Sequence, residues 1–199
     1  DFSFDLYTKT GTENHKEVVQ KLFTILNDKG YLEEQVSRQP YSEESEMFLS
    51  DRYIEGDCPH CPSRTKGDQC DNCGQDFEPS DLKNLISTID NSKVTFKETN
   101  HIYLKLPKFQ ENLNKWINSK SYWRPSVKNQ SLGFLSNGLI DRAITRDIDW
   151  GVEVPIKNYE KKRIYVWFEA VIGYLSASIE WAKSDKNISN NKNIWKEWW

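Results

Sequence analysis

The chain has 199 residues, of which 37% are hydrophobic and 13% aromatic, so it can bury a core and is not expected to be disordered. It has no run of about 18 apolar residues and no charged-then-apolar leader, so we expect a cytoplasmic protein with no membrane partner. Residues 1–100 carry 11 basic and 20 acidic side chains (−9), and residues 101–199 carry 16 and 10 (+6). The chain begins at Asp1 and its single methionine is Met47, which predicts a fragment of a longer protein.

The first two predicted elements are a strand and a helix. Residues 1–10 (DFSFDLYTKT) alternate apolar and polar side chains, a pattern typical of a half-buried strand. Asn14 followed three residues later by Glu17 resembles a capping box, and apolar residues recur at helical spacing up to Leu26. Gly30 then suits a left-handed helix stop.

The middle of the chain breaks into short pieces. Residues 31–80 are rich in charge, Gly and Pro, with a strand or hairpin arm expected only at 47–54. After it we expect a loop with short extended pieces over 82–96, a strand over 101–106 and a helix from Pro107 to Ile117. A helix over 127–139, broken by Gly133 and ended by Gly138, and a strand–turn–strand over 144–155 follow.

The last third contains the most apolar segments. Residues 164–168 (IYVWF) are a continuous apolar run, which predicts a buried parallel strand. Residues 170–182 are apolar on nearly every side and predict a buried helix. The tail ends in IWKEWW, and such a Trp-rich end either docks on this domain or marks a cut edge.

Four cysteines form the clearest chemical pattern. Cys58, Cys61, Cys70 and Cys73 make two CxxC pairs separated by eight residues, and Gly74 suits a tight knuckle turn. Four thiolates suit a tetrahedral Zn²⁺ with no open position, so the site is predicted to be structural. Iron held as in rubredoxin and two disulfides are the alternatives, and His60 is surplus to a four-thiolate site.

A second pattern lies at the junction of the last predicted strand and helix, YVWFEAVIGYLSAS. The carboxyl end of a strand in an open α/β sheet is where ligands bind. Trp167, Ala170 and Tyr174 there would line an apolar pocket for a small apolar ligand, and plain core packing is the alternative.

Several segments together resemble the methionyl-tRNA synthetase family, in order and along nearly the whole chain. They are FSFDLYTKT with the helix that holds His15, MFLSDRYIEGDCPHC with CDNCG, HIYLKLPKF, ITRDIDWGVEVP and YVWFEAVIGYLSA. The resemblance implies an α/β fold: a partial Rossmann-type class I synthetase catalytic domain, interrupted by a mixed α+β connective insertion with a zinc knuckle. It implies catalytic segments at 1–30 and 164–199, an insertion at 31–163, and a knuckle at about 55–77.

The resemblance also implies an activity and its residues. The family activates methionine with ATP, with Mg²⁺, and transfers it to tRNA(Met). The four cysteines match its zinc site, and Arg146 matches an arginine close to the active site, which makes it a candidate catalytic residue. Trp167, Ala170, Val171 and Tyr174 match the wall of the methionine pocket, although Val171 and Glu169 differ from the Pro and Asp of many members.

The family's HIGH-type and KMSKS-type sequences, which contact ATP, are not among the 199 residues, so this chain alone is expected to be inactive. Two other functions remain open. One is a non-enzymatic zinc-knuckle module that binds nucleic acid or protein, which the acidic surroundings of the cysteines disfavour. The other is a class I synthetase for a different apolar amino acid, which the pairing of the knuckle with the Trp-containing pocket disfavours.

Overall fold

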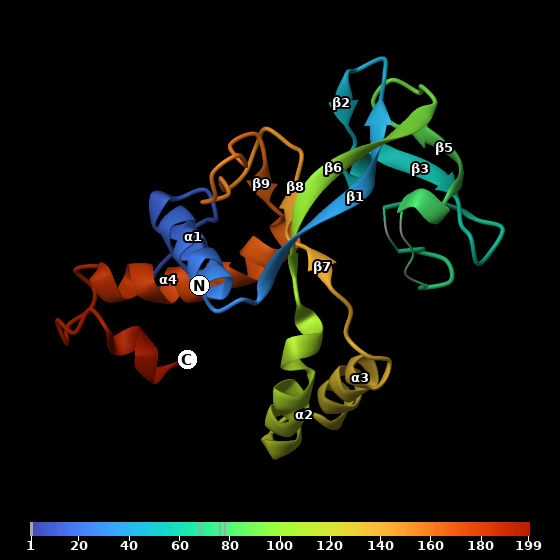
Figure 1. Ribbon diagram of the computed structural model, residues 1–199. Helices are drawn as coiled ribbons and strands as arrows, with labels where there is room; N and C mark the ends of the chain where they lie inside the picture. The colour runs from blue at the N-terminus through green and yellow to red at the C-terminus, as the bar shows by residue number, and fades with distance from the viewer. Residues whose placement is uncertain (1, 68, 76, 78) are drawn as a thin grey trace.

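The computed structural model describes residues 2–67, 69–75, 77 and 79–199. A long two-stranded ribbon of β1 and β6 joins two groups of elements, with α1 and α4 at one end and the cysteine region at the other (Figure 1). The α-helices in these described residues are α1 (Glu13–Asp28), α2 (Gln110–Ser119), α3 (Pro125–Ser136) and α4 (Val166–Lys183). The strands are β1 (Leu32–Ser42), β2 (Met47–Phe48), β3 (Ile54–Asp57), β4 (Arg64–Lys66), β5 (Lys83–Ser87), β6 (Val94–Leu104), β7 (Arg142–Ala143), β8 (Thr145–Arg146) and β9 (Arg163–Ile164).

The ribbon belongs to a sheet of order β2-β1-β6-β7, beside a second sheet of order β4-β3-β5 and the pair β8-β9. Its two long strands are antiparallel and in register from Leu32 opposite Leu104 to Ser42 opposite Val94. Residues 82–96, expected to be a loop with short extended pieces, contain β5 and the start of β6, whereas β1 was missed. The sequence of β1, LEEQVSRQPYS, is mostly polar, and its backbone hydrogen bonds to β6 hold it in place.

The larger core lies where α1 and α4 meet the β6, β8 and β9 segments. Its fully buried members on α1 are Val19 and Phe23, and the Phe23 ring packs edge-on against Phe168, with centroids 6.5 Å apart. The rest of this core comes from Ile102, Ile144, Val152, Val154, Tyr159, Ile164 and Ile172.

The predicted first helix is confirmed, but its N-cap is two residues earlier than the expected Asn14. Thr12 is the N-cap, and its Oγ1 accepts a hydrogen bond from the backbone N–H of His15 at 3.2 Å. Asn14 lies inside the helix and donates from Nδ2 to the carbonyl of Ser176 on α4. Gly30 has φ +71°, the left-handed conformation predicted for the helix stop.

Two predicted strands are wrong. Residues 2–10 form no strand, and Phe2 is 93% exposed, because no described segment offers its backbone a pairing partner. The run 164–168 forms only the end of β9, which pairs antiparallel with β8, and α4 begins at Val166. A short apolar run cannot be assigned to a strand or a helix by periodicity alone.

Helix α4 was also expected to be buried on nearly every side, and this is wrong. Only Ile172, Ser176 and Ala182 are fully buried on it. The Trp-rich tail docks on this helix: the Trp198 ring lies 5.1 Å from that of Trp181, and Trp199 Nε1 donates to Ser178.

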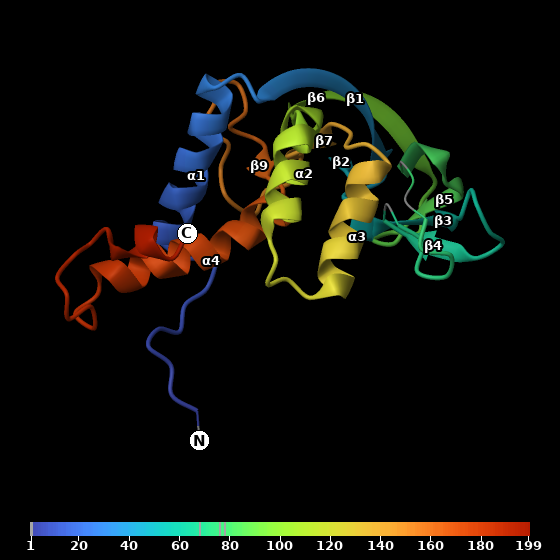
Figure 2. The same cartoon turned by 90° about the horizontal axis from the view of Figure 1, so that it is seen from below.

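Helices α2 and α3 form a hairpin that projects from the ribbon (Figures 1 and 2). The predicted start at Pro107 is confirmed, since a short 3₁₀ turn over Leu106–Phe109 leads into α2. Gly133 does not break α3, but Gly138 follows its end with φ +79°. In the described part of the chain, no helix combines the length and the apolar character needed to cross a membrane.

Candidate functional site

The four cysteines lie together at the end of β3 and in the turn after β4. Their sulfur atoms are all within 4.8 Å of one another, with Cys58 Sγ 3.9 Å from Cys73 Sγ and Cys61 Sγ 3.7 Å from Cys70 Sγ. These separations exceed a disulfide bond of about 2.05 Å. They match the ~3.8 Å between ligands of a tetrahedral zinc ion with Zn–S bonds of about 2.3 Å. The cluster could therefore hold a metal ion.

Two tight turns bring the sulfur atoms to this spacing. The backbone N–H of Cys58 donates to the Ser63 carbonyl at 2.9 Å, and that of Cys70 donates to Gln75 at 3.0 Å. Gly74 follows the second pair with φ +69° and donates to the carbonyl of Cys70. Gly74 thus takes the knuckle position that the sequence predicted for it.

Two of the four thiols, Cys61 and Cys73, have strongly shifted pKa values in opposite directions. A backbone hydrogen bond involving Ser63 lowers the pKa of Cys61 to about 6, and Asn72 adds to this effect. At Cys73 the backbone contact with Gln75 lowers the pKa, but burial and the three neighbouring sulfurs outweigh it and raise the pKa to about 11. Four thiolates at this distance repel one another, and a bound cation would remove that repulsion.

A pocket of about 480 Å³ lies between the knuckle (residues 55–77), the ribbon and the start of α4. Its lining comes from the residues around the cysteines, from β6 and β7, and from the start of α4. It includes Asp51, Gln69, Phe77, Tyr103, Arg142, Arg146, Tyr165, Trp167 and Phe168. Arg146 and Trp167, two residues singled out from the sequence, are therefore in the same pocket. Asp51 and Tyr165 were not singled out.

Arg146 is held in one position in this pocket. Its guanidinium lies over the ring of Tyr165, with Cζ 3.7 Å from the centroid, and its Nη1 donates to the carbonyls of Ala143 and Thr145. The Tyr165 hydroxyl donates to Asp51 Oδ2, which lies 3.8 Å from Arg146 Nη2. Arg146 Nε is buried without a hydrogen-bond partner in the described residues. A guanidinium held in one position on the lining of a pocket suits an anionic ligand.

A buried network lies beneath β8 and supports Arg146. Thr145 Oγ1 accepts from the Ile102 N–H and lies 2.9 Å from His101 Nδ1, and His101 Nε2 lies 3.2 Å from Asp147 Oδ2. Lys162 contacts the other oxygen of Asp147. Burial lowers the pKa of His101 against the opposing effect of Asp147, so the neutral Nε2–H form donates to the carboxylate.

The four residues predicted for the methionine pocket lie on one face of α4. Trp167, Ala170, Val171 and Tyr174 follow the i, i+3, i+4, i+7 spacing of a single helix stripe. This stripe is open to solvent: the Trp167 and Tyr174 side chains are each 73% exposed. Of the four, Trp167 is the one that lines the pocket.

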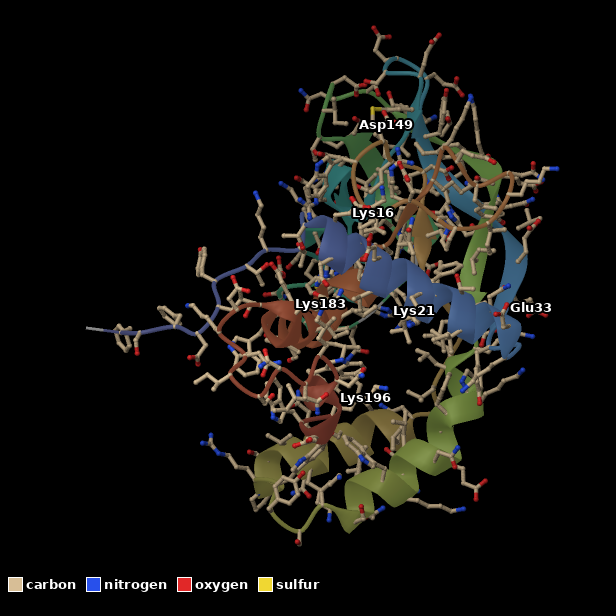
Figure 3. The ribbon with its side chains drawn as sticks, turned by 90° about the vertical axis from the view of Figure 1, so that its left-hand side faces the viewer. Lys16, Lys21, Glu33, Asp149, Lys183 and Lys196 are labelled. Carbon is tan, nitrogen blue, oxygen red and sulfur yellow. The ribbon has the colours of Figure 1, made fainter. Side chains whose placement is uncertain are left out.

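The opposite side of the same helix is tied to α1 by a buried histidine. His15 Nε2 lies 2.6 Å from Glu169 Oε2, and its Nδ1 lies 2.9 Å from Ser176 Oγ. Lys183 of α4 reaches Asn14 of α1, and Figure 3 shows Lys16, Lys21 and Lys183 on one side of these helices. These contacts fix the rotation of α4 about its axis and so the direction of the exposed stripe.

Comparison with known proteins identifies the family. A model described as "tRNA synthetases class I (M)" matches residues 1–199. The chain belongs to this family. Methionine–tRNA ligase of Dehalococcoides mccartyi (strain ATCC BAA-2266 / KCTC 15142 / 195) is 48% identical over 198 residues, covering 99% of this chain and 35% of that protein. The enzyme of Chloroflexus aggregans is 48% identical over 201 residues and is covered to 33%.

Solved structures show the same fold. Methionyl-tRNA synthetase of Mycobacterium tuberculosis bound by methionyl-adenylate aligns with a TM-score of 0.59 and 21% identity over 93% of this chain and 32% of that chain. Its apo form aligns with a TM-score of 0.56. The fold of this class I (M) synthetase chain is thus the mixed α/β arrangement expected, a partial catalytic domain with its connective insertion. The chain spans about a third of the length of the curated relatives it matches.

Proposed function

We propose that this chain is part of a methionine–tRNA ligase, which joins methionine to tRNA(Met) at the expense of ATP. The main support for this proposal is that the chain combines two features. It has the four-cysteine cluster, and it has the stripe of Trp167, Ala170, Val171 and Tyr174 on α4 near the fixed side chain of Arg146. The 48% identity to ligases of that activity supports it. The knuckle is acidic, which gives a nucleic-acid-binding knuckle module no support.

The stripe on α4 has the chemistry of a methionine side-chain pocket. Trp167 and Tyr174 lie about one turn before and one turn after Ala170 on this face, so two aromatic residues flank a small one along the helix. A thioether beside an aromatic ring gains about 0.3–1.5 kcal/mol, which favours methionine over a hydrocarbon chain of similar size. His15 and Glu169 would keep this stripe aimed at the ligand.

Arg146 would supply positive charge in the pocket that Trp167 also lines. In the proposed reaction the methionine carboxylate attacks the α-phosphate of ATP, and the bond to the β-phosphate breaks with release of pyrophosphate. Both reacting groups are therefore anionic. A guanidinium already held by Tyr165, Asp51 and two carbonyls needs no reorganisation when they bind. ATP, with Mg²⁺, is a substrate of the whole enzyme, and no residue of this chain other than Arg146 is assigned to its phosphates.

The metal of the knuckle is proposed to be one structural Zn²⁺ held by Cys58, Cys61, Cys70 and Cys73. When bound, the ion would cross-link the two CxxC turns. It would offer no site for a reaction, because the four thiolates fill all four coordination positions. We divide the chain into catalytic segments at 1–30 and 164–199 and a connective insertion at 31–163. We place the enzyme in the cytoplasm, where tRNA is charged.

Methionine-dependent ATP–pyrophosphate exchange tests this function in the longer protein that carries the segment. Trp167→Ala should raise KM for methionine about tenfold and leave KM for ATP nearly unchanged. Trp150→Ala is the control, because that ring is 84% exposed and is not among the residues that line the pocket.

ATP–pyrophosphate exchange that depends on leucine or isoleucine instead of methionine would overturn the proposal. It would show a class I synthetase specific for a different amino acid. The 199-residue chain by itself should give no exchange, since the HIGH-type and KMSKS-type sequences are not among its residues. Measurable exchange by that chain would refute this second expectation.

A further inference from the structure

His101 is a buried histidine to which the proposed function assigns no role. It lies on β6, its side chain is 1% exposed, and it is not among the residues that line the pocket of about 480 Å³. Each ring nitrogen has a partner on the segment around β8: Nδ1 lies 2.9 Å from Thr145 Oγ1, and Nε2 lies 3.2 Å from Asp147 Oδ2. These two partners are the residues directly before and after Arg146.

The alternation of side chains along this segment explains how one ring can hold both neighbours of Arg146. Successive side chains of an extended segment point to opposite sides, so residues 145 and 147 share one side and residue 146 has the other. Thr145 and Asp147 contact His101, whereas Arg146 lines the pocket. His101 thus fixes the chain on each side of Arg146 without lining that pocket itself.

A second set of contacts anchors Asp147 to the same part of the fold. Thr99 Oγ1, also on β6, donates to Asp147 Oδ2 at 3.0 Å, and Lys162 donates to the other carboxylate oxygen and to Thr99 Oγ1. The Lys162 side chain is 12% exposed, so its charge and that of Asp147 offset each other inside the protein. The charge of Asp147 is therefore balanced locally and does not compete with a ligand for Arg146.

The surroundings of His101 also decide which ring nitrogen carries the proton. Burial raises the pKa of Asp147, but its contacts with His101 and Lys162 outweigh this and lower it, so the carboxylate is ionised and accepts from Nε2–H. Burial lowers the pKa of His101 against the opposing effect of Asp147, and the charges of Lys162 and Arg146 lower it further. The ring is therefore neutral, and its Nδ1 accepts from the Thr145 hydroxyl.

We propose that His101 is a positioning residue for methionine activation, and that it keeps the Arg146 guanidinium in place by holding Thr145 and Asp147. The inference deepens the proposed function and rests on it. His101 would touch neither methionine nor ATP, and its effect would come from preorganisation. A charge stabilises reacting anions most when it is already in position, and a displacement of about 1 Å can cost about 100-fold in rate.

A double-variant cycle in the longer protein tests whether His101 acts through Arg146. His101→Gln should lower kcat of methionine-dependent ATP–pyrophosphate exchange about tenfold, while KM for methionine stays within about twofold because Trp167 is untouched. Starting from Arg146→Ala, the same change should lower kcat by less than about twofold, because no guanidinium remains to be positioned. A merely structural role of His101 would give the same loss in both backgrounds.

Two further variants guard the cycle against misfolding and non-specific effects. Gln can place a donor near the position of Nε2, and Asn can place an acceptor near that of Nδ1, so each should keep one of the two contacts. His101→Asn therefore carries the cycle if His101→Gln does not fold. Asn100→Ala is the matched control and should keep kcat, because Asn100 is adjacent on β6 but its side chain is exposed and donates to Glu34.

NMR of the 199-residue chain gives a readout that needs no activity. The chain has three histidines, and the signals of His101 are those that disappear in His101→Gln. At pH 7 we expect a neutral ring with its proton on Nε2. The Nε–H signal of Arg146 should report an ordered guanidinium that becomes mobile in His101→Gln and stays ordered in Asn100→Ala. This mobility decides the question if Arg146→Ala has no measurable exchange.

Three results would each overturn the proposal. They are equal loss of kcat in the two backgrounds, a His101 ring that is charged or protonated on Nδ1 at pH 7, and an Arg146 side chain whose order does not depend on His101. None of them affects the proposed function, because the unchanged longer protein would still catalyse methionine-dependent exchange. Absence of that exchange, together with the expected NMR results, would refute the function and not the contact between His101 and the segment that carries Arg146.

Discussion

At one end of the β1–β6 ribbon, α1 and α4 share a core of nine buried residues, all apolar or aromatic. At the other end the described core has seven buried residues, and two of them are the metal-ligand candidates Cys58 and Cys70. Apolar burial alone rarely stabilises so small a unit, whereas metal binding of about 10–16 kcal/mol in zinc peptides is ample. The two ends of the ribbon therefore depend on different chemistry, and we expect them to respond to different perturbations.

The largest expected effect is loss of the metal. Cys70→Ser should lower bound zinc from about one equivalent to well below it and unfold the turns around the cysteines, because the site then lacks a thiolate. Elemental analysis and amide hydrogen exchange measure both effects. Ser63→Ala, next to the site but not a ligand, is the control and should keep its zinc. One full equivalent in Cys70→Ser would show that the metal does not need the fourth sulfur.

A substitution in the core of α1 and α4 should lower the stability of that end and leave the metal site intact. Phe23→Ala removes a fully buried ring and should lower the free energy of unfolding by about 3–5 kcal/mol, from lost burial and a cavity against Phe168. Zinc content should stay at one equivalent, since no side chain of α1 is in the knuckle core. Chemical denaturation and metal analysis on one sample check the pair of outcomes. Loss of zinc would show that the two ends fold as one unit.

Breaking the hydrogen bond between α1 and α4 should have a smaller effect. Glu169→Ala leaves the buried His15 Nε2 without its partner and should cost about 1–3 kcal/mol. In the longer enzyme it should raise KM for methionine, because the stripe on α4 loses its support. Glu180→Ala, whose carboxylate accepts from Thr8 near the exposed N-terminal segment, is the control on the same helix. An unchanged KM would mean that Glu169 does not position the stripe.

The smallest expected effect is on the pH dependence of stability. Burial lowers the pKa of His101 and the contact with Asp147 raises it, so the two effects partly cancel. The pKa of His101 is lowered in the folded chain, so the unfolded chain binds the extra proton and stability falls as the pH drops below about 6.5. The pKa of Asp147 is also lowered: burial raises it, but His101 and Lys162 outweigh this, so further stability is lost as the pH falls through that folded pKa.

His101→Gln should flatten the decline of stability between pH 7 and 5 without removing the later one. Denaturation at several pH values, followed by hydrogen exchange in β8 and β9, measures this separately from acid release of the metal. An identical pH profile for the variant would remove His101 as the source.

A local pattern in the sequence was enough to find the cysteine site, because the two CxxC turns depend on spacing within a short segment. Trp167, Ala170, Val171 and Tyr174 were expected at a strand–helix junction and from the resemblance. Their position on one helix face was not predicted, because α4 begins at Val166 and includes Trp167. Contacts between distant segments were not accessible. His15 and Glu169 are 154 residues apart, and nothing near either residue indicates that they meet. Strand β1 was missed for the same reason, because its polar sequence is extended only through pairing with β6.

The mistaken strands show the converse limit. The alternation in residues 1–10 and the apolar run at 164–168 are patterns that strands share with other structures. What decided each case was the neighbour: no described segment pairs with the first, and hydrogen bonds from Phe168 and Glu169 to Tyr165 turn the second into a helix.

The most direct test is amide hydrogen exchange of the 199-residue chain with and without a zinc chelator. It asks whether the cysteine end is stabilised by its metal and the α1–α4 end by apolar packing. We predict that amides in β3, β4 and the cysteine turns lose protection when the metal is removed, while those of α1 and α4 keep theirs. Equal loss in both regions, or no loss in either, would contradict this division of the molecule.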